Sequence, residues 1–345
     1  MSRCTNRAAW CGVLVSWVMT IVVAPWAAWG ADTNATEAFE QNKRLGRGVN
    51  VIGYDPLWRD RSRARFQAEY FQMIRQAGFD HVRINLHPYR DGKPDANHKI
   101  SETYLKTLDW AVEQALASKL RVILDFHEFT AMAKDPLSKK ERFLAMWGQI
   151  AERCKGLPSE VYFEVLNEPN GELTPAMWNQ FLSEALELIR KTNPTRTVII
   201  GPAFWNGIGH LGELQLPEND RNIIVTIHYY SPMEFTHQGA AWTSQRDKLG
   251  VAWNGTEQER AAVARDFDKA QSWAEQQRRP LYLGEFGAYD KAEMASRVRY
   301  ISYVAREAEK RGWSWGYWQF DGDFILYDIP KKQWIEPIRK ALIPG

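Results

Sequence analysis

Cysteine is scarce in this chain of 345 residues, which contains only three. Cys4 and Cys11 lie within residues 1–30, so Cys154 is the single thiol in the rest of the sequence. A single thiol allows no intramolecular disulfide. Cys154 ends an apolar series with helical spacing, and we therefore predict a buried core thiol rather than a nucleophile. The preceding members of that series are Phe143, Met146, Trp147, Ile150 and Ala151.

Residues 31–345 have no net charge. The chain has 44 basic and 42 acidic side chains, and residues 1–30 contain two basic residues, Arg3 and Arg7, and no acid. Residues 31–345 therefore have 42 of each sign. Such a balance gives no general attraction to nucleic acid or to an anionic membrane, and it would suit a neutral polymer as partner.

Residues 1–30 have the pattern of a secretory signal peptide. The two arginines precede an apolar run, residues 8–28, and small residues follow with the spacing of a cleavage site before Ala31. An uncleaved membrane anchor is the alternative, because the run is long for a signal, but Pro25 and the small-residue ending favour cleavage. We therefore predict a secreted or periplasmic protein that begins at Ala31.

No linker rich in proline and serine interrupts residues 31–345, so we predict one domain. Short apolar runs typical of strands alternate with segments of helical periodicity, and they begin near residues 49, 82, 121, 161, 197, 223, 281 and 315. Eight strands alternating with helices predict an α/β fold, a (β/α)₈ barrel. A doubly wound open sheet is the alternative, but no Gly-x-Gly-x-x-Gly turn follows the first run.

The segments outside this alternation are expected to be of three kinds. Residues 31–45 form a polar leader, and residues 333–342 form a short closing helix. Residues 229–256 are rich in aromatic and polar side chains without clean periodicity. We expect this last segment to be a long loop that walls the active-site face.

Two glutamates stand where strand-like runs end. Glu168 lies in Asn167-Glu168-Pro169 after the run 161–166, and Pro169 cannot donate to a strand ladder. Glu285 lies in Gly284-Glu285-Phe286 at the end of a run that starts at residue 280. Because the active site of such a barrel lies at the C-terminal ends of its strands, the two carboxylates are a candidate acid and nucleophile pair.

Further polar and aromatic side chains follow the same and other strands. Each alone fits an ordinary core role, but their convergence on one end of a barrel favours a site. A metal centre is the competing interpretation, although no His-x-His pair or His-Glu-x-x-His helix is present, and aromatic faces suit a sugar. We therefore expect no metal and no cofactor. The side chains are Arg83, His127, Glu128, Asn167, His228, Tyr230, Trp318 and Gln319.

These strand ends, together with residues 39–48, resemble family 5 of the glycoside hydrolases, the cellulase family of clan A. The resemblance extends over nearly all of residues 39–342. The segments Thr226–Tyr230 and Glu234–Ala240 resemble a bacterial subgroup of endo-β-1,4-glucanases, some of which also cut mannan. The resemblance implies that Glu168 is the general acid/base and that Glu285 is the nucleophile.

The resemblance also implies roles for the neighbouring side chains. Arg83 and Tyr230 would hydrogen-bond the nucleophile, and Asn167 would contact the sugar 2-hydroxyl. His127 and His228 would line the catalytic subsite, with Trp318 as a platform under a sugar. Asn50, His237 and Trp242 would make further substrate contacts. Two positions depart from the subgroup: Glu128 stands where a histidine is usual and Gln319 where a glutamate is usual, which puts substrate preference in doubt.

The predicted function is a retaining endo-β-1,4-glucanase. Arg83 and Tyr230 would keep Glu285 ionised, and the charge of Glu285 would keep Glu168 protonated, with the two carboxyl groups about 5–5.5 Å apart. An endo-β-1,4-mannanase or a bifunctional enzyme is an alternative, and a non-catalytic carbohydrate-binding barrel is one from another class. The expected partner is a β-1,4-linked polysaccharide. We expect a monomer that binds no nucleic acid and has no stable membrane insertion after cleavage.

Overall fold

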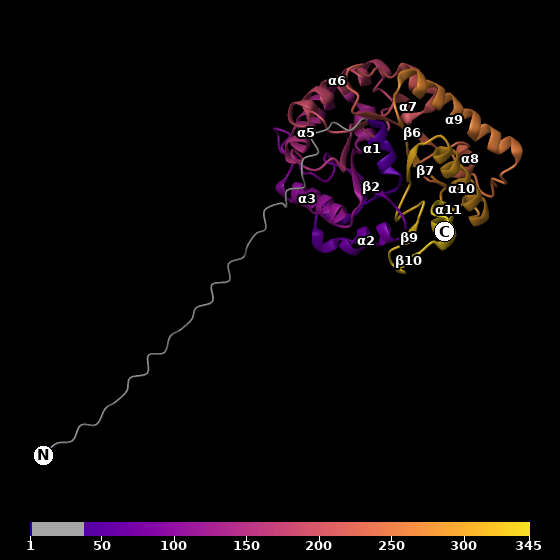
Figure 1. Ribbon diagram of the computed structural model, residues 1–345, viewed down its shortest axis with the longest axis horizontal. Coiled ribbons are helices and arrows are strands. Elements are labelled where there is room, and N and C mark those ends of the chain that lie inside the picture. Colours follow the sequence, from indigo (N-terminus) through magenta and orange to yellow (C-terminus); the bar gives the residue numbers. More distant parts are fainter. Residues whose placement is uncertain (2–37) are drawn as a thin grey trace. The chain divides into compact units, whose positions relative to one another are not determined.

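Eight parallel strands close into a barrel in the order β1 to β8, with helices around it (Figure 1). This computed structural model describes Met1 and residues 38–345, so the predicted signal peptide and cleavage site lie outside the described residues. The closed order confirms the (β/α)₈ barrel and excludes an open sheet. Residues 38–345 belong to one compact unit, as a single barrel domain requires.

The bounds of the elements follow the predicted alternation closely. The barrel strands are β1 (Arg47–Val51), β2 (His81–Leu86), β3 (Arg121–Phe126), β4 (Val161–Glu164), β5 (Val198–Ile200), β6 (Ile223–Tyr229), β7 (Leu281–Phe286) and β8 (Ser314–Tyr317). The α-helices are α1 (Ala38–Leu45), α2 (Ala68–Gln76), α3 (Glu102–Ala117), α4 (Phe129–Lys134), α5 (Pro136–Arg153), α6 (Pro175–Thr192), α7 (Ala203–Asn206), α8 (Met233–Thr236), α9 (Glu257–Gln277), α10 (Met294–Lys310) and α11 (Glu336–Leu342). Short 3₁₀ turns η1 (Pro56–Trp58), η2 (Arg61–Arg63) and η3 (Ile208–Glu213) and a hairpin of β9 (Tyr327–Asp328) and β10 (Gln333–Trp334) complete the described part.

Two terminal expectations were wrong. Residues 38–45 are not a polar leader but helix α1, whose buried positions 38, 41, 42 and 45 have helical spacing. Two of those buried residues, Gln41 and Asn42, are polar, which hid the pattern in the sequence. The closing helix begins at Glu336 rather than at residue 333, because Pro337 favours a first turn there and Gln333 pairs with Asp328 in the hairpin.

Helix α1 closes the N-terminal end of the barrel. Its Leu45 packs with inward-facing side chains of β3, β4 and β7, among them Tyr162 and Tyr282. The Tyr162 hydroxyl donates to Gln41 Oε1 at 2.7 Å, and the Tyr282 hydroxyl lies 3.0 Å from His81 Nε2. This end of the barrel is therefore filled, and its buried polar groups are paired within the protein.

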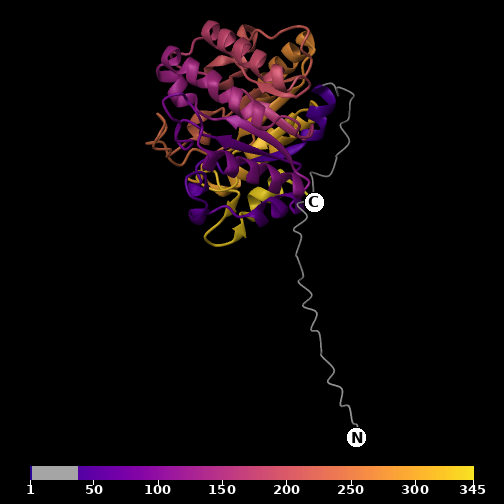
Figure 2. The same ribbon diagram turned by 90° about the vertical axis from the view of Figure 1, so that its left-hand side faces the viewer.

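The helices cover the barrel on its outside, and the two views show them on opposite sides of the strands (Figures 1 and 2). The hairpin β9–β10 lies beside α2 in both views, and the Tyr70 and Tyr327 rings are 5.4 Å apart. Between β6 and α9, residues 230–256 contain only the short helix α8. This confirms the predicted long loop after the sixth strand. Cys154 is buried at the end of α5, and burial raises the pKa of its thiol to about 12, as expected of a core residue.

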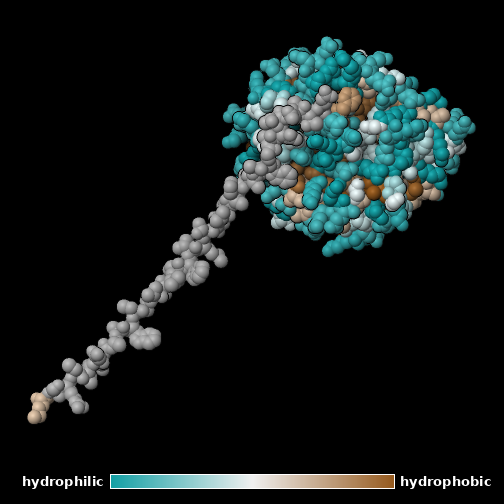
Figure 3. Space-filling view, viewed as in Figure 1, coloured by the Kyte–Doolittle hydropathy of each residue, from teal (hydrophilic) through white to brown (hydrophobic). Residues whose placement is uncertain are grey.

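The surface seen in the view of Figure 1 is mainly hydrophilic, with only small apolar areas (Figure 3). Within residues 38–345, no helix has both the length and the apolar character needed to cross a bilayer.

Candidate active site

Arg83 is the centre of the side-chain network at the C-terminal end of the barrel. It lies on β2, has no exposed surface, and donates hydrogen bonds to two glutamates. Its Nε and Nη2 donate to Glu164 at 2.7 and 2.8 Å, and its Nη1 donates to Glu285 Oε1 at 2.7 Å. Nη2 also donates to Asn167 Oδ1 at 2.8 Å. One buried guanidinium therefore fixes both the predicted nucleophile and the amide beside the predicted acid.

Two buried carboxylates of this network, Glu164 and Asp125, were not among the predicted site residues. Asp125 Oδ2 lies 3.2 Å from Arg83 Nη2 and 2.6 Å from His127 Nδ1. Strand alternation could have found both, since Tyr162 and Ile123 face the barrel interior and each carboxylate lies two residues further along its strand. Both carboxylates contact the Arg83 guanidinium, and Asp125 orients His127.

Glu285 reaches the site because β7 contains a bulge. Ile227 on β6 pairs with Leu283, but the next residue, His228, pairs with Glu285, so Gly284 is the extra residue. A Cβ on Gly284 would lie 2.5 Å from Thr226 Oγ1 and 3.0 Å from His228 Nε2, so only glycine fits. Without the bulge, alternation from inward-facing Tyr282 would direct Glu285 outward. Its second oxygen, Oε2, accepts from the Tyr230 hydroxyl at 3.0 Å.

Glu168 follows β4 in a left-handed conformation, with φ of 43°. Such a conformation is uncommon for a residue with a side chain and is maintained here by the surrounding contacts. The Asn170 amide donates to the Glu168 carbonyl at 2.7 Å, and Asn167 N donates to the Phe126 carbonyl at 3.0 Å. The loop thereby directs the Glu168 carboxylate over the barrel, toward Glu285.

His228 lies between the two glutamates. Its Nδ1 is 2.8 Å from Glu168 Oε1 and 3.6 Å from Glu285 Oε2. Its Nε2 is 3.2 Å from Nδ2 of Asn206, a residue that the sequence did not single out. Because the amide nitrogen is a donor, Nε2 must accept and the ring proton must be on Nδ1, where it can donate to Glu168.

The two glutamates differ in their electrostatic surroundings. Burial raises the pKa of Glu168 to about 8, and the charges of Asp125 and Glu164 add to the rise while Arg83 opposes it. Burial also raises the pKa of Glu285, to about 7, against the opposing influence of His228 and Arg83. Arg83 donates directly to Glu285 and not to Glu168. The Arg83 and Tyr230 hydrogen bonds favour the ionised form of Glu285, which leaves Glu168 as the proton donor.

The group of Glu168, His228 and Glu285 could also be considered as a metal site, since one ligand atom of each lies within 4.8 Å of the others. The donors are already engaged, however. Both Glu285 oxygens accept hydrogen bonds from Arg83 and Tyr230, and both His228 nitrogens have partners. A guanidinium 2.7 Å from Glu285 would also repel a cation. The donor set fits proton transfer better than metal binding.

His127 and Trp318 lie side by side at the site, with ring centroids 5.5 Å apart and nearly parallel planes. His127 Nε2 is 3.4 Å from Asn167 Nδ2. Trp318 and Gln319 are both half-buried, and the peptide bond between them is cis. The structure therefore brings these predicted residues to the same end of the barrel as the two glutamates.

Three other predicted substrate-binding residues are buried and engaged with the protein itself. The Asn50 side chain accepts from Arg83 and Asn85 and donates to the carbonyls of Gly284 and Tyr317, so it holds Arg83 in place. Glu128 Oε1 accepts the backbone amides of Tyr89 and Arg90 at 2.5 and 3.1 Å. His237 packs edge-on against Tyr230 at 4.8 Å.

Exposed aromatic side chains flank the site. Trp242 is exposed and packs edge-on against Tyr289 at 5.2 Å. Phe204 and Trp205, just after β5, are also exposed, and both have positive φ of 57°. The Trp205 amide donates to the Pro169 carbonyl at 3.2 Å, which brings this pair beside Glu168.

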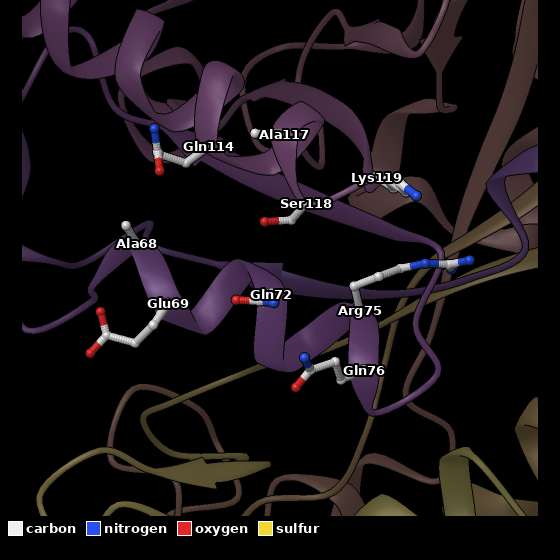
Figure 4. A pocket seen from close by; sticks show the side chains of 9 residues that line it. All are labelled: Ala68, Glu69, Gln72, Arg75, Gln76, Gln114, Ala117, Ser118 and Lys119. Carbon is white, nitrogen blue, oxygen red and sulfur yellow. The ribbon is translucent and has the colours of Figure 1, made fainter.

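A polar hollow of about 550 Å³ lies elsewhere, between α2 and the end of α3 (Figure 4). Its lining includes Glu69, Arg75 and Lys119 but none of the network around Arg83. This hollow has one carboxylate and no second acid, so it does not provide the pair of carboxylates that the chemistry needs.

A buried and a half-buried carboxylate at the C-terminal end of a parallel (β/α)₈ barrel, with a guanidinium and a phenol on the buried one, define a barrel of the two-carboxylate glycosidase type. Comparison with known protein families is more specific. Residues 42–323 match the family model for cellulase, glycosyl hydrolase family 5, and the chain belongs to this family.

Individual relatives agree with this assignment. Endoglucanase H of Acetivibrio thermocellus is 31% identical over 90% of this chain, and endoglucanase 3 of Fibrobacter succinogenes is 27% identical over 88%. The chain spans only 34% and 53% of those two relatives. Among solved structures, Thermotoga maritima Cel5A in complex with mannotriose has a TM-score of 0.84 and 41% identity, with 89% of this chain and 100% of that chain covered.

Proposed function

We propose that this protein is a retaining endo-β-1,4-glucanase that hydrolyses β-1,4-glucan chains by double displacement. The observation that carries the proposal is the pairing of Glu168 and Glu285. Carboxylate oxygens of the two lie within 4.8 Å of each other, with Arg83 and Tyr230 on Glu285 and His228 on Glu168. Carboxylates this close suit direct attack on the sugar by one of them, whereas an inverting enzyme leaves room for a water molecule between the sugar and its second carboxylate.

In the first step Glu285 attacks the anomeric carbon while Glu168 protonates the departing glycosidic oxygen. The proton on Glu168 leaves with the released sugar, and the electron pair of the broken bond goes to the leaving oxygen. The Arg83 and Tyr230 hydrogen bonds orient the Glu285 oxygens. The product of this step is a glycosyl ester of Glu285 and an ionised Glu168.

In the second step Glu168 acts as a base. It removes a proton from water, the water oxygen bonds to the anomeric carbon, and the bond to Glu285 breaks. Glu168 is protonated again, as its raised pKa of about 8 favours, and Glu285 returns to the carboxylate. His228, which donates from Nδ1 to Glu168, keeps that carboxylate directed at the reacting bond in both steps.

The relatives support β-1,4-glucan as substrate, since the names of those cited above include endoglucanase H and endoglucanase 3. A further solved structure, of a hyperthermophilic endo-β-1,4-glucanase in complex with substrate, is 38% identical and has a TM-score of 0.85, with 90% of this chain and 100% of that chain covered. A second substrate, β-1,4-mannan, is favoured by the mannotriose complex of Thermotoga maritima Cel5A. We propose glucan as the main substrate and mannan as an additional one.

Release of reducing ends from carboxymethyl-cellulose, barley glucan, glucomannan, galactomannan and xylan tests this proposal. We expect activity on the glucans and lower activity on the mannans. Activity on galactomannan alone would establish a mannanase instead. Binding to these polymers without any product would favour the non-catalytic alternative.

We also propose that the protein acts as a monomer outside the cytoplasm, after cleavage before Ala31. The support for export and cleavage is the sequence of residues 1–30 described above. N-terminal sequencing of exported protein tests the cleavage, and a retained Met1 with membrane-bound activity would contradict it. Light scattering of the exported protein tests the monomer.

A further inference from the structure

Tyr54 is an exposed aromatic residue beside the site that the sequence did not single out. It lies in the loop between β1 and η1, and 54% of its surface is exposed. Its ring centroid is 5.0 Å from that of His87 and 6.5 Å from that of His127. Burial raises the pKa of Tyr54 to about 12 against the opposing charge of Arg90, and the charges of Glu285 and Glu168 add to the rise. The ring therefore borders His127, a member of the network around Arg83, while more than half of the side chain is open to solvent.

Arg90 holds this ring in place. Its guanidinium lies over the Tyr54 ring, 5.0 Å from the centroid, and its Nη2 donates to the Gly53 carbonyl at 2.6 Å. Arg90 also pairs with Asp91 at 2.9 Å, which fixes the guanidinium from the other side. A cation over an aromatic face stabilises this arrangement and restricts the ring.

Glu128 in turn holds Arg90. Its Oε1 accepts the backbone amides of Tyr89 and Arg90, so the end of β3 fixes the turn that follows β2. Glu128 is only 7% exposed, which leaves little of it open to a substrate. A series of direct contacts therefore connects Glu128, Arg90 and Tyr54 across the ends of β3, β2 and β1.

The position of Tyr54 relative to the acid indicates which part of a substrate it would meet. In a closed barrel of eight strands, β1 and β5 are opposite each other. Glu168 follows β4 and is joined through Pro169 to Trp205, which follows β5. Because the acid must face the leaving group, the β5 side receives the leaving sugars, and Tyr54 lies on the opposite side, toward the non-reducing end.

We propose that Tyr54 is a substrate-binding residue that borders the active site on the non-reducing side, and that Arg90 and Glu128 are its positioning residues. The proposal rests on the proposed glycosidase function. An amphipathic ring held at a fixed angle offers an apolar face to sugar C–H groups and a hydroxyl to sugar oxygens. A pre-positioned ring also binds with little loss of side-chain freedom.

The test uses the full chain and an aryl β-cellobioside, in which both sugars occupy the non-reducing side and the aryl group replaces the leaving sugars. Tyr54→Ala should lower kcat/KM by about ten-fold, mainly through KM. Arg90→Gln should also raise KM, but by a smaller factor than Tyr54→Ala, because the Tyr54 ring loses the guanidinium that packs over it. Tyr54→Phe should lie between Tyr54→Ala and the unmodified protein, since only the hydroxyl is lost.

Tyr303→Phe is the matched control. Its hydroxyl donates to the Arg260 carbonyl between helices α10 and α9, away from the network around Arg83, and kcat/KM should stay within about two-fold of that of the unmodified protein. Thermal unfolding of every variant checks that folding is retained. Tyr54→Phe and Arg90→Gln keep the test decisive if Tyr54→Ala does not fold.

Cleavage of reducing-end-labelled cellopentaose gives a readout that a merely structural role would not change. If the contact with Tyr54 on the non-reducing side is lost, cellopentaose should bind more often with fewer sugars on that side. Cleavage should therefore move toward the non-reducing end of the chain. Unchanged cleavage positions together with KM within about two-fold would overturn the role of Tyr54. Failure of the proposed function is a separate outcome, because the unmodified protein would then release no product from any β-1,4-glucan.

Discussion

The two ends of the barrel are built from the same strands, yet they contain opposite kinds of side chains. At the N-terminal end, inward-facing Tyr162 and Tyr282 pack with Leu45 of α1. Two residues further along the same strands, Glu164 accepts hydrogen bonds from Arg83, and the Gly284 carbonyl accepts one from Asn50, which in turn accepts from Arg83. Moving two residues along each strand, from one inward-facing position to the next, therefore leads from a largely apolar layer to a charged one.

This difference indicates how the barrel divides stability from chemistry. The polar groups at the N-terminal end, which α1 closes, pair with one another and need no ligand, as the Tyr162–Gln41 and His81–Tyr282 contacts show. At the other end, Glu168 and Glu285 keep raised pKa values because burial is only partly offset by Arg83. Substitutions at the two ends should therefore change different measured quantities.

The largest expected effect is that of Glu285→Gln. An amide cannot form the covalent ester, so kcat should fall on the order of 10⁵-fold on every substrate, aryl glycosides included. Steady-state kinetics measures the loss, and thermal unfolding should show that the variant remains folded. A residual rate above about one hundredth of the original would show that another group is the nucleophile.

Glu168→Gln should have the next largest effect, and it should depend on the leaving group. Polysaccharide hydrolysis should fall by about 10²–10⁴-fold, because the leaving oxygen is no longer protonated. Aryl glycosides with acidic phenols need little protonation, so their first step should persist as a burst while release of the intermediate is slow.

The pH profile gives an independent reading of the same variant. In the unmodified protein, activity should fall as pH rises through the raised pKa of Glu168, about 8, since the acid loses its proton. Glu168→Gln should remove this alkaline decrease for aryl glycosides. An unchanged decrease would assign the titration to a different residue.

Tyr162→Phe addresses the opposite end of the barrel. It removes the hydrogen bond to Gln41 in a buried layer and should lower the free energy of unfolding by about 1–3 kcal/mol. The value of kcat should not change, because Tyr162 lies in the layer at the N-terminal end of the barrel, away from the two catalytic glutamates. Denaturant unfolding and steady-state kinetics measure the two quantities, and a loss of kcat without loss of stability would contradict the division between the ends.

The smallest effect expected is that of Glu128→Ala. Glu128 holds the turn at Tyr89 and Arg90 and is outside the proton-transfer path, so the ratio of glucan to mannan activity should change by about ten-fold or less. Activity ratios on matched polymers measure this change. A loss as large as that of Glu168→Ala on every substrate would place Glu128 in the chemistry.

The sequence predicted the barrel well because its strands are short, continuous apolar runs and most of the helices between them are longer segments of period 3.6. Helix α1 escaped prediction because Gln41 and Asn42 are polar yet buried. Their partners, Tyr162 and the Leu281 carbonyl, are distant in sequence. The stabilising contacts of this helix arise only when the barrel closes.

The site was predictable where a motif ends a strand and less so where contacts are long-range. Asn167-Glu168-Pro169 and Gly284-Glu285-Phe286 identified the candidate pair from the chain alone. Whether Asn50 or Glu128 is free to meet a substrate depends on partners such as Arg83 and Arg90 far along the chain. The bulge at Gly284 also depends on pairing with β6, which no local pattern specifies.

The stereochemistry of the first-formed product is the most direct test of the paired role of Glu168 and Glu285. Proton NMR of a fresh digest distinguishes the two anomers before they interconvert. Double displacement by Glu285 predicts that the β-anomer appears first, followed by slow mutarotation to the equilibrium mixture. An α-anomer appearing first would mean that water, not Glu285, attacks the sugar, and it would contradict the mechanism.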